Sequence, residues 1–161
     1  NFIFYYANLH NTEYNPNGMG AATEYRFPCD DNTVDFAFAT SVFTHMRQPD
    51  IRHYLTELHR VLTPSGRALL SFYILNEEND HLMRNGHATL HFAHVLDHGY
   101  TIDPQTPERA IAYPVEVINS MLLGADLYFI LPIFYGSWSG QTSMLEAQDI
   151  VIVTKPRRKT S

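Results

Sequence analysis

The stretch that decides the fold runs from residue 34 to residue 75 and reads VDFAFATSVFTHMRQPDIRHYLTELHRVLTPSGRALLSFYIL. It opens with a short, mostly apolar run, as expected of a strand buried on both faces. Pro49 and Asp50 suit the first turn of a helix, because proline needs no amide hydrogen there and the acid complements the positive helix end. The stretch therefore predicts a strand over residues 34–40 and a helix over residues 49–62.

The second half of this stretch completes a unit of strand, helix and strand. Residues 63–66 end the helix, since Pro64 cannot continue it and Gly66 supplies the turn. Residues 67–75 then predict another buried strand. A strand, a helix and a second strand form a βαβ unit, whose strands are parallel and whose crossover is right-handed in nearly all cases. The residues that place one apolar stripe on the helix are Ile51, Tyr54, Leu55, Leu58, Val61 and Leu62.

The flanking sequence extends this unit to one α/β domain over residues 1–161. Residues 2–9 are aromatic and β-branched, which predicts a strand. Residues 10–33 are dense in Asn, Gly, Pro and Asp and predict a long loop. Residues 89–96 fit a strand or a helix. The remaining predicted elements, which bring the total to about five strands, are helices over 76–85 and 116–124 and strands over 127–134 and 149–154.

Composition limits the classes of function. A chain of 161 residues with 45% hydrophobic residues has enough apolar surface for a folded core. The net charge of −6 argues against binding to nucleic-acid phosphates, and we interpret the basic residues 155–159 as a solvated tail. No apolar run reaches about 18 residues, so neither a membrane span nor a membrane partner is expected. No signal peptide is expected either. The single cysteine, Cys29, excludes an intramolecular disulfide and fits a reducing, cytoplasmic compartment.

Two motifs resemble those of class I S-adenosylmethionine-dependent methyltransferases. Residues 27–45, FPCDDNTVDFAFATSVFTH, are similar to the family's LPFPDNSFDVV with the small-residue turn and histidine that follow it. Residues 60–67, RVLTPSGR, resemble the family's RVLKPGGR at the expected distance downstream. The resemblance runs from residue 1 to about residue 155. It implies a Rossmann-like sheet of strand order 3-2-1-4-5-7-6 that is incomplete here, with the first two strands and their helices absent.

The resemblance also implies where the methyl donor, S-adenosylmethionine, makes contact. In an open α/β sheet, ligands bind beyond the carboxyl ends of the strands. The implied cofactor-binding residues are therefore Asn8 and Leu9 after the first strand, and Ala39, Thr40 and Ser41 after the next. Asn8 stands where the family has an acid that receives the adenine amino group, and its amide oxygen can also accept that hydrogen bond.

Two anchors of the family are expected upstream of Asn1, namely the glycine-rich turn and the acid that binds the ribose. Gly18-Met19-Gly20 does not replace that turn, because it has no strand before it and no helix after it. We therefore expect a truncated methyltransferase whose parent uses S-adenosylmethionine, with weak or absent binding of the cofactor by these residues.

The implied activity is methyl transfer to a small-molecule oxygen or nitrogen acceptor. His45 is the candidate catalytic residue, since a polar side chain there can take a proton from the acceptor. The alternative is a helix-start histidine bonded to nearby backbone. Tyr135 and Trp138 are candidate substrate residues of an acceptor pocket, or else they pack in the core.

Two hypotheses compete with methyl transfer. One is a metal site formed by His87, His91, His94 and His98, which would share one face of a helix but scatter on a strand; we expect no metal. The other is a non-catalytic fragment that acts as an interaction or dimerisation module. Open edges of the strands over residues 2–9 and 34–40 favour a homodimer, unless these two strands pair directly with each other.

Overall fold

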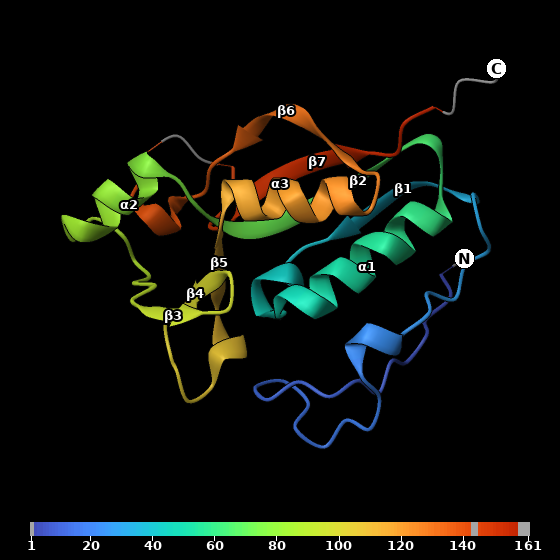
Figure 1. Cartoon of the computed structure of the whole chain (residues 1–161), viewed down its shortest axis with the longest axis horizontal. Coiled ribbons are helices and arrows are strands. Elements are labelled where there is room, and N and C mark those ends of the chain that lie inside the picture. The colour runs from blue at the N-terminus through green and yellow to red at the C-terminus, as the bar shows by residue number, and fades with distance from the viewer. Residues whose placement is uncertain (1, 143–144, 158–161) are drawn as a thin grey trace.

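The computed structural model describes residues 2–142 and 145–157, and within them it forms one α/β sheet with three α-helices (Figure 1). The strand order is β3-β4-β5-β2-β7-β6, and β1 lies beside β2. The helices are α1 (Gln48–Val61), α2 (Glu77–Arg84) and α3 (Val115–Gly124). The strands are β1 (Val34–Ala39), β2 (Leu62–Leu75), β3 (His94–Leu96), β4 (Gly99–Thr101), β5 (Ile111–Pro114), β6 (Tyr128–Phe134) and β7 (Asp149–Thr154).

The predicted βαβ unit is confirmed. Strands β1 and β2 are parallel, with Ala37 opposite Ala68, and α1 connects them. The apolar stripe of α1 is fully buried at Ile51 and Leu55. Helices α1 and α3 lie on the same face of the sheet, where their apolar side chains form the main core with the inward residues of β2 and β7 (Figure 1).

The order β1-β2-β7-β6 reproduces the 4-5-7-6 part of the order that the resemblance implies, so the sheet is an incomplete Rossmann-like one. The βαβ pattern also leads us to expect a sheet rich in parallel pairs, and this expectation is wrong. Only β1/β2 and β2/β5 are parallel in the described residues, while β2/β7, β6/β7, β3/β4 and β4/β5 are antiparallel. Consecutive short strands pair antiparallel because a parallel pair needs a long crossover.

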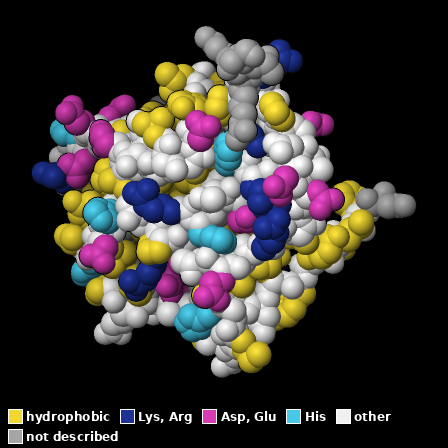
Figure 2. All heavy atoms as spheres, turned by 45° about the vertical axis from the view of Figure 1, so that its right-hand side comes forward, with side chains coloured by type: hydrophobic (Ala, Val, Ile, Leu, Met, Phe, Trp, Pro, Cys, Tyr) yellow, Lys and Arg dark blue, Asp and Glu magenta, His cyan; other side chains and the backbone are white. Residues whose placement is uncertain are grey.

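Residues 2–9 do not form the strand that their composition predicts. Leu9 makes one isolated bridge to Gly20, and the side chains of Phe2 and Phe4 are 91% and 90% exposed. In Figure 2, apolar side chains run along the right-hand edge of the view, where this segment lies. A strand needs a neighbour for its backbone groups, and in the described part of the chain β1 pairs with β2 alone. Direct pairing with β1 is therefore absent from this structure.

The turn after α1 places its strain on a serine. Ser65 has a φ of 71°, whereas the sequence assigned the turn to Gly66. Gly66 is needed for another reason, because a Cβ there would lie 2.8 Å from the carbonyl oxygen of Thr63. The two residues divide the task, one taking the left-handed backbone and the other the close approach.

Lys155 corrects the prediction of a solvated basic tail. It is 7% exposed, and its Nζ donates to the carbonyl oxygens of His59 (2.7 Å) and Leu62 (2.9 Å) and to Oδ1 of Asn32 (2.7 Å). Its charge thus meets the negative end of α1. Arg158 and Lys159 lie outside the described residues.

The remaining elements follow the sequence in part. The predicted long loop over residues 10–33 is confirmed, with one 3₁₀ turn at Ala22–Glu24. The helices over 76–85 and 116–124 are found as α2 and α3, and residues 89–93 are irregular before β3. Across the described ranges, the structure has no helix that is long and apolar enough to cross a membrane.

Candidate functional site

The candidate site lies where two strands, β1 and β5, pair with successive parts of the same edge of β2. Strand β1 ends with Ala39 opposite Leu70, and β5 begins its pairing with Ala112 opposite Tyr73. Both strands lie on the side of β2 away from β7, so the chain that leaves β1 turns out of the sheet between them. A 3₁₀ turn at Phe43–His45 follows at once. This turn lies at the carboxyl end of a parallel strand, where α/β sheets bind ligands.

A cleft of about 460 Å³ opens between this turn and the N-terminal loop. Three of the predicted site residues line it together, namely Leu9, Ser41 and His45. Tyr14 and Tyr54 add aromatic surface. None of the described residues that line this cleft carries a carboxylate.

The other predicted cofactor residues lie beside this cleft. Thr40 lines an adjoining cleft of about 270 Å³, to which Ser41 also contributes. Ala39 is half-buried and packs against the main core. Asn8 is exposed, and its carboxamide oxygen accepts a hydrogen bond from Nδ2 of Asn15 at 3.2 Å.

The Gly18-Met19-Gly20 segment holds the chain at Asn8. The amides of Met19 and Gly20 donate to the carbonyl oxygen of Asn8 at 3.1 and 3.0 Å. A Cβ on Gly18 would lie 2.2 Å from the carbonyl oxygen of Leu9, so only glycine fits there. Gly18 and Met19 lie in irregular chain and Gly20 forms an isolated bridge with Leu9, so the segment holds the chain at the edge of the cleft.

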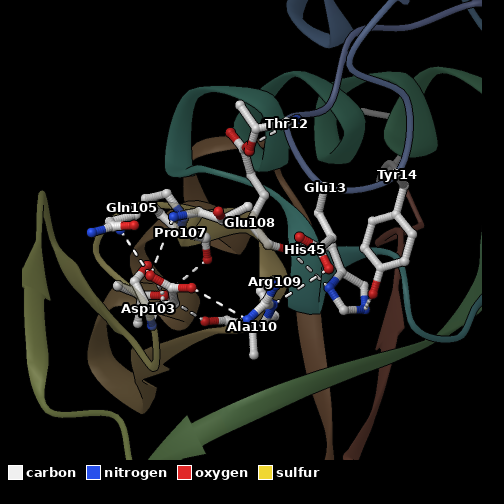
Figure 3. A network of polar contacts seen from close by, with 12 residues as sticks. Thr12, Glu13, Tyr14, His45, Asp103, Gln105, Pro107, Glu108, Arg109 and Ala110 are labelled. Atoms are coloured by element: carbon white, nitrogen blue, oxygen red, sulfur yellow. Dashed lines mark hydrogen bonds and ion pairs between the residues drawn. The ribbon is translucent and has the colours of Figure 1, made fainter.

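His45 is held in one orientation by two different chain segments (Figure 3). Its Nδ1 lies 3.0 Å from the carbonyl oxygen of Glu108, in the 3₁₀ turn Pro107–Arg109. Its Nε2 lies 3.4 Å from the hydroxyl of Tyr14, whose ring packs edge-on against the imidazole with centroids 4.7 Å apart. A carbonyl oxygen only accepts, so Nδ1 carries the hydrogen and the neutral ring offers the lone pair of Nε2.

The side chain of Glu108 ties the loop to this site. It accepts hydrogen bonds from the amide of Thr12 (3.0 Å), from the Thr12 hydroxyl and from Nε of Arg47 (3.2 Å). The neighbouring Arg109 donates to Glu13 at 3.4 Å. Sequence analysis missed Glu108, because a three-residue 3₁₀ turn far along the chain leaves no periodic pattern.

Tyr135 and Trp138 do not line this cleft. Trp138 is 2% exposed, packs against Tyr73 with ring centroids 5.6 Å apart, and donates from Nε1 to Oδ2 of Asp149 at 2.8 Å. Tyr135 is half-buried against the main core. Asp149 also accepts from the amides of Gly136 (2.7 Å) and Ile74 (2.6 Å), and burial raises its pKa to about 6.

The four histidines of the sequence pattern do not share a helix face. His94 lies in β3, while His87, His91 and His98 lie in irregular or turn segments. The described part of the chain has no group of three or more His, Cys, Asp or Glu side chains arranged to hold a metal ion. The helical cluster considered from the sequence is therefore wrong.

Comparison with known families supports the interpretation of this turn. Residues 6–70 match the family described as "Methyltransferase domain", a range that includes the cleft residues Leu9, Ser41 and His45. The match identifies a methyltransferase domain in this part of the chain. The matched range covers the N-terminal loop, β1, α1 and the first part of β2, so the residues that line the cleft lie within it.

Solved structures share the fold of this chain. An S-adenosylmethionine-dependent methyltransferase from Methanosarcina mazei is 15% identical, with a TM-score of 0.54 over 86% of this chain and 66% of its own. The 1,6-didemethyltoxoflavin-N1-methyltransferase of Burkholderia thailandensis, solved with 1,6-didemethyltoxoflavin and S-adenosylhomocysteine, is 13% identical, with a TM-score of 0.50 over 85% of this chain and 49% of its own.

The [4+2]-cyclase SpnF is 15% identical, with a TM-score of 0.50 over 86% of this chain and 54% of its own. The same fold thus occurs in a protein named as a cyclase, so the reaction has to be argued from the site. The chain spans about half to two thirds of the length of these relatives.

Proposed function

We propose that this chain belongs to an enzyme that transfers a methyl group from S-adenosylmethionine to an oxygen or nitrogen of a small molecule. One observation carries the proposal: His45, with the lone pair of Nε2 set by its bond to Glu108, lines the same cleft as Leu9 and Ser41. The candidate proton acceptor and two residues that the resemblance implies for the methyl donor thus line one small cleft.

The cleft fits a molecule of this kind. Its volume lies within the roughly 300–1,000 Å³ of small-molecule sites. The rings of Tyr14 and Tyr54 offer faces that attract a cation such as a sulfonium. Leu9 and Ser41 would hold the donor directly, and Asn8, Ala39 and Thr40 would bound the site. The sulfonium supplies an activated methyl group, so the chain has to orient donor and acceptor and exclude water.

His45 would take the proton that an oxygen or nitrogen acceptor loses. The bond from Nδ1 to the Glu108 carbonyl fixes the tautomer, so the basic nitrogen faces the cleft before any ligand binds. The Tyr14 hydroxyl lies near Nε2 in this structure and would yield that position to the acceptor.

We propose that the residues lining the cleft bind S-adenosylmethionine weakly. The described lining of the cleft has no carboxylate to accept hydrogen bonds from ribose hydroxyls. A charge-assisted bond of that kind contributes about 1.5–3 kcal/mol, which is roughly one to two orders of magnitude in affinity.

Equilibrium dialysis with methyl-labelled S-adenosylmethionine tests the proposal. We expect saturable binding that S-adenosylhomocysteine displaces and that Ser41→Ala weakens. Ser120→Ala, at an exposed position of α3 outside the cleft, is the matched control and should leave binding unchanged. Label that binds without saturation, or that S-adenosylhomocysteine fails to displace, would contradict it.

A second function, a homodimerisation module, is supported by the sheet face opposite α1 and α3. On β1 the small side chains of Ala37 and Ala39 pack on the core, so Phe36 and Phe38 point the other way, and both are exposed. The register places Leu69, Ile152 and Ile130 in the same row as Phe38. An apolar face of this kind is costly in water and is typical of an interface.

Sedimentation of one charge substitution against a matched control tests this dimer. Phe38 is 73% exposed on the face, and Val95 is 77% exposed on β3, which lies in the separate β3-β4-β5 part of the sheet. We expect twice the 18.5 kDa of the chain for wild type and Val95→Glu, and the monomer for Phe38→Glu. A wild type that sediments at 18.5 kDa at high concentration would refute the dimer.

A further inference from the structure

A ring of hydrogen bonds lies under the turn that follows β1. The amide of Ser41 donates to Oγ of Ser71 at 2.8 Å, the hydroxyl of Ser71 donates to Oε1 of Gln148 at 2.6 Å, and Nε2 of Gln148 donates to Oγ of Ser41 at 2.9 Å. Ser71 is buried in the middle of β2, and Gln148 immediately precedes β7. Three segments far apart in sequence are thus joined at one residue of the candidate cofactor site.

The ring also decides the direction of each hydrogen. Oγ of Ser71 accepts from the Ser41 amide, and its own hydrogen goes to the Gln148 oxygen, because an amide oxygen only accepts. That orientation turns Nε2 of Gln148 toward Ser41 and, at 3.4 Å, toward the hydroxyl of Tyr73. Since Oγ of Ser41 accepts from Gln148, the hydrogen of the Ser41 hydroxyl points out of the ring.

Ser41 lies where its hydroxyl can donate a hydrogen bond to a bound ligand. It lines both the cleft of about 460 Å³ that contains His45 and the adjoining cleft of about 270 Å³. Its φ of 53° is one that residues with a Cβ rarely adopt, so the turn needs outside support to persist. The bond from its amide to Ser71 supplies such support, and Gln148 holds the hydroxyl of Ser71 in place.

We propose that Gln148 is a positioning residue of the methyl-donor site, which directs the Ser41 hydroxyl as a hydrogen-bond donor into the cleft. This inference rests on the proposed function, because it takes a bound S-adenosyl ligand as the acceptor of the Ser41 hydrogen bond. Gln148 acts through Ser41, and its own amide is already engaged by the ring.

Two substitutions of Gln148 distinguish its effect on the direction of the Ser41 hydroxyl from its effect on the stability of the turn at Ser41. In Gln148→Glu the carboxylate still accepts from Ser71 but also accepts from Ser41, which turns the Ser41 hydrogen inward. Gln148→Ala removes the ring closure altogether. Gln141→Glu is the matched control, because Gln141 donates to Oδ1 of Asn79 at 2.7 Å, away from the ring.

The experiment measures S-adenosylhomocysteine affinity and the hydrogen exchange of the Ser41 amide by NMR. We expect Gln148→Glu to weaken binding about three- to tenfold, as Ser41→Ala does, with wild-type exchange at Ser41. The double variant Ser41→Ala/Gln148→Glu should bind no more weakly than either single variant, because both substitutions remove the same hydrogen-bond donor. Gln148→Ala should weaken binding and also speed exchange about tenfold or more, and Gln141→Glu should change neither.

The outcomes distinguish this inference from the function on which it rests. Wild-type affinity in Gln148→Glu, or losses that multiply in the double variant, would overturn the inference while the methyl-donor site stands. Absence of S-adenosylhomocysteine binding by wild type would overturn the proposed function and the ligand role of Ser41 with it. In that case exchange at Ser41 still decides whether Gln148 supports the turn, and unchanged exchange in Gln148→Ala would refute that too.

Discussion

Nδ1 of His45 lies 3.0 Å from the carbonyl oxygen of Glu108, which joins the turn after β1 to the 3₁₀ turn before β5. This contact predicts that the neutral imidazole carries its hydrogen on Nδ1 and presents an unprotonated Nε2 to the cleft. Long-range ¹H–¹⁵N correlation spectra distinguish the two ring nitrogens directly. A neutral His45 protonated on Nε2 would contradict the proposed role as proton acceptor. His81, exposed on α2, is an internal reference for the spectra, because its Nε2 lies 2.9 Å from the amide donor Nδ2 of Asn85.

Lys155 is expected to stabilise the end of α1. Lys155→Met keeps the apolar stem but leaves the carbonyl oxygens of His59 and Leu62 without this donor. We expect a loss of about 2–3 kcal/mol in the free energy of unfolding, measured with urea. Arg157→Met, at an exposed position two residues on, should change it by less than about 0.5 kcal/mol. Equal effects of the two substitutions would contradict this account.

The buried carboxyl of Asp149 predicts a pH dependence of stability. Burial raises its pKa to about 6 from 3.8, so between these values the folded chain binds the proton more tightly than the unfolded chain. The contribution of Asp149 is therefore fully present below about pH 4 and is lost as pH rises through about 6.

Comparison with Asp149→Asn isolates this effect from the other carboxyls. The free energy of unfolding of wild type minus that of the variant should fall by up to about 3 kcal/mol between pH 4 and pH 7.5. The variant should be less stable at pH 4. In the variant an amide nitrogen faces one of the backbone N–H groups whose hydrogen bond the Asp149 carboxyl accepts in wild type. A difference that does not change with pH would contradict the prediction.

Near the start of β2, Ser65 adopts a left-handed backbone and Gly66 leaves room for a close backbone contact. Gly66→Ala places a Cβ 2.8 Å from the Thr63 carbonyl oxygen and should cost more than about 1 kcal/mol in thermal or urea unfolding. Ser65→Gly relieves a φ of 71° and should be neutral or stabilising. The reverse order of stabilities would show that the turn has a different backbone.

The sequence predicts the parts of the fold that have a long, regular pattern. The stripe of α1 and the apolar runs of β1 and β2 repeat over several turns or residues, so the sequence alone predicts the βαβ unit. Strands β3, β4 and β5 have three or four residues each, too few to show a period. Residues 2–9 have the composition of a strand but no neighbouring strand to pair with, which composition alone does not report.

The candidate site shows the same division. Ser41 and His45 lie in the motif over residues 27–45 and Leu9 ends the first predicted strand, so the resemblance names all three from the sequence. Glu108, Tyr14 and Gln148 reach the site from a 3₁₀ turn, a loop and a strand end that no local pattern connects to it. Trp138, a candidate acceptor-pocket residue from the sequence, is instead buried in a core cluster and donates to Asp149.

The most direct test of the central claim is an NMR titration of the chain with S-adenosylhomocysteine. The account predicts saturable shifts that centre on Leu9, Ser41 and His45, with a dissociation constant of about 0.1–1 mM, equivalent to about 4–5.5 kcal/mol. Shifts that saturate only at residues away from this cleft, or no saturable shift up to about 10 mM, would contradict the claim that the turn after β1 forms the methyl-donor site.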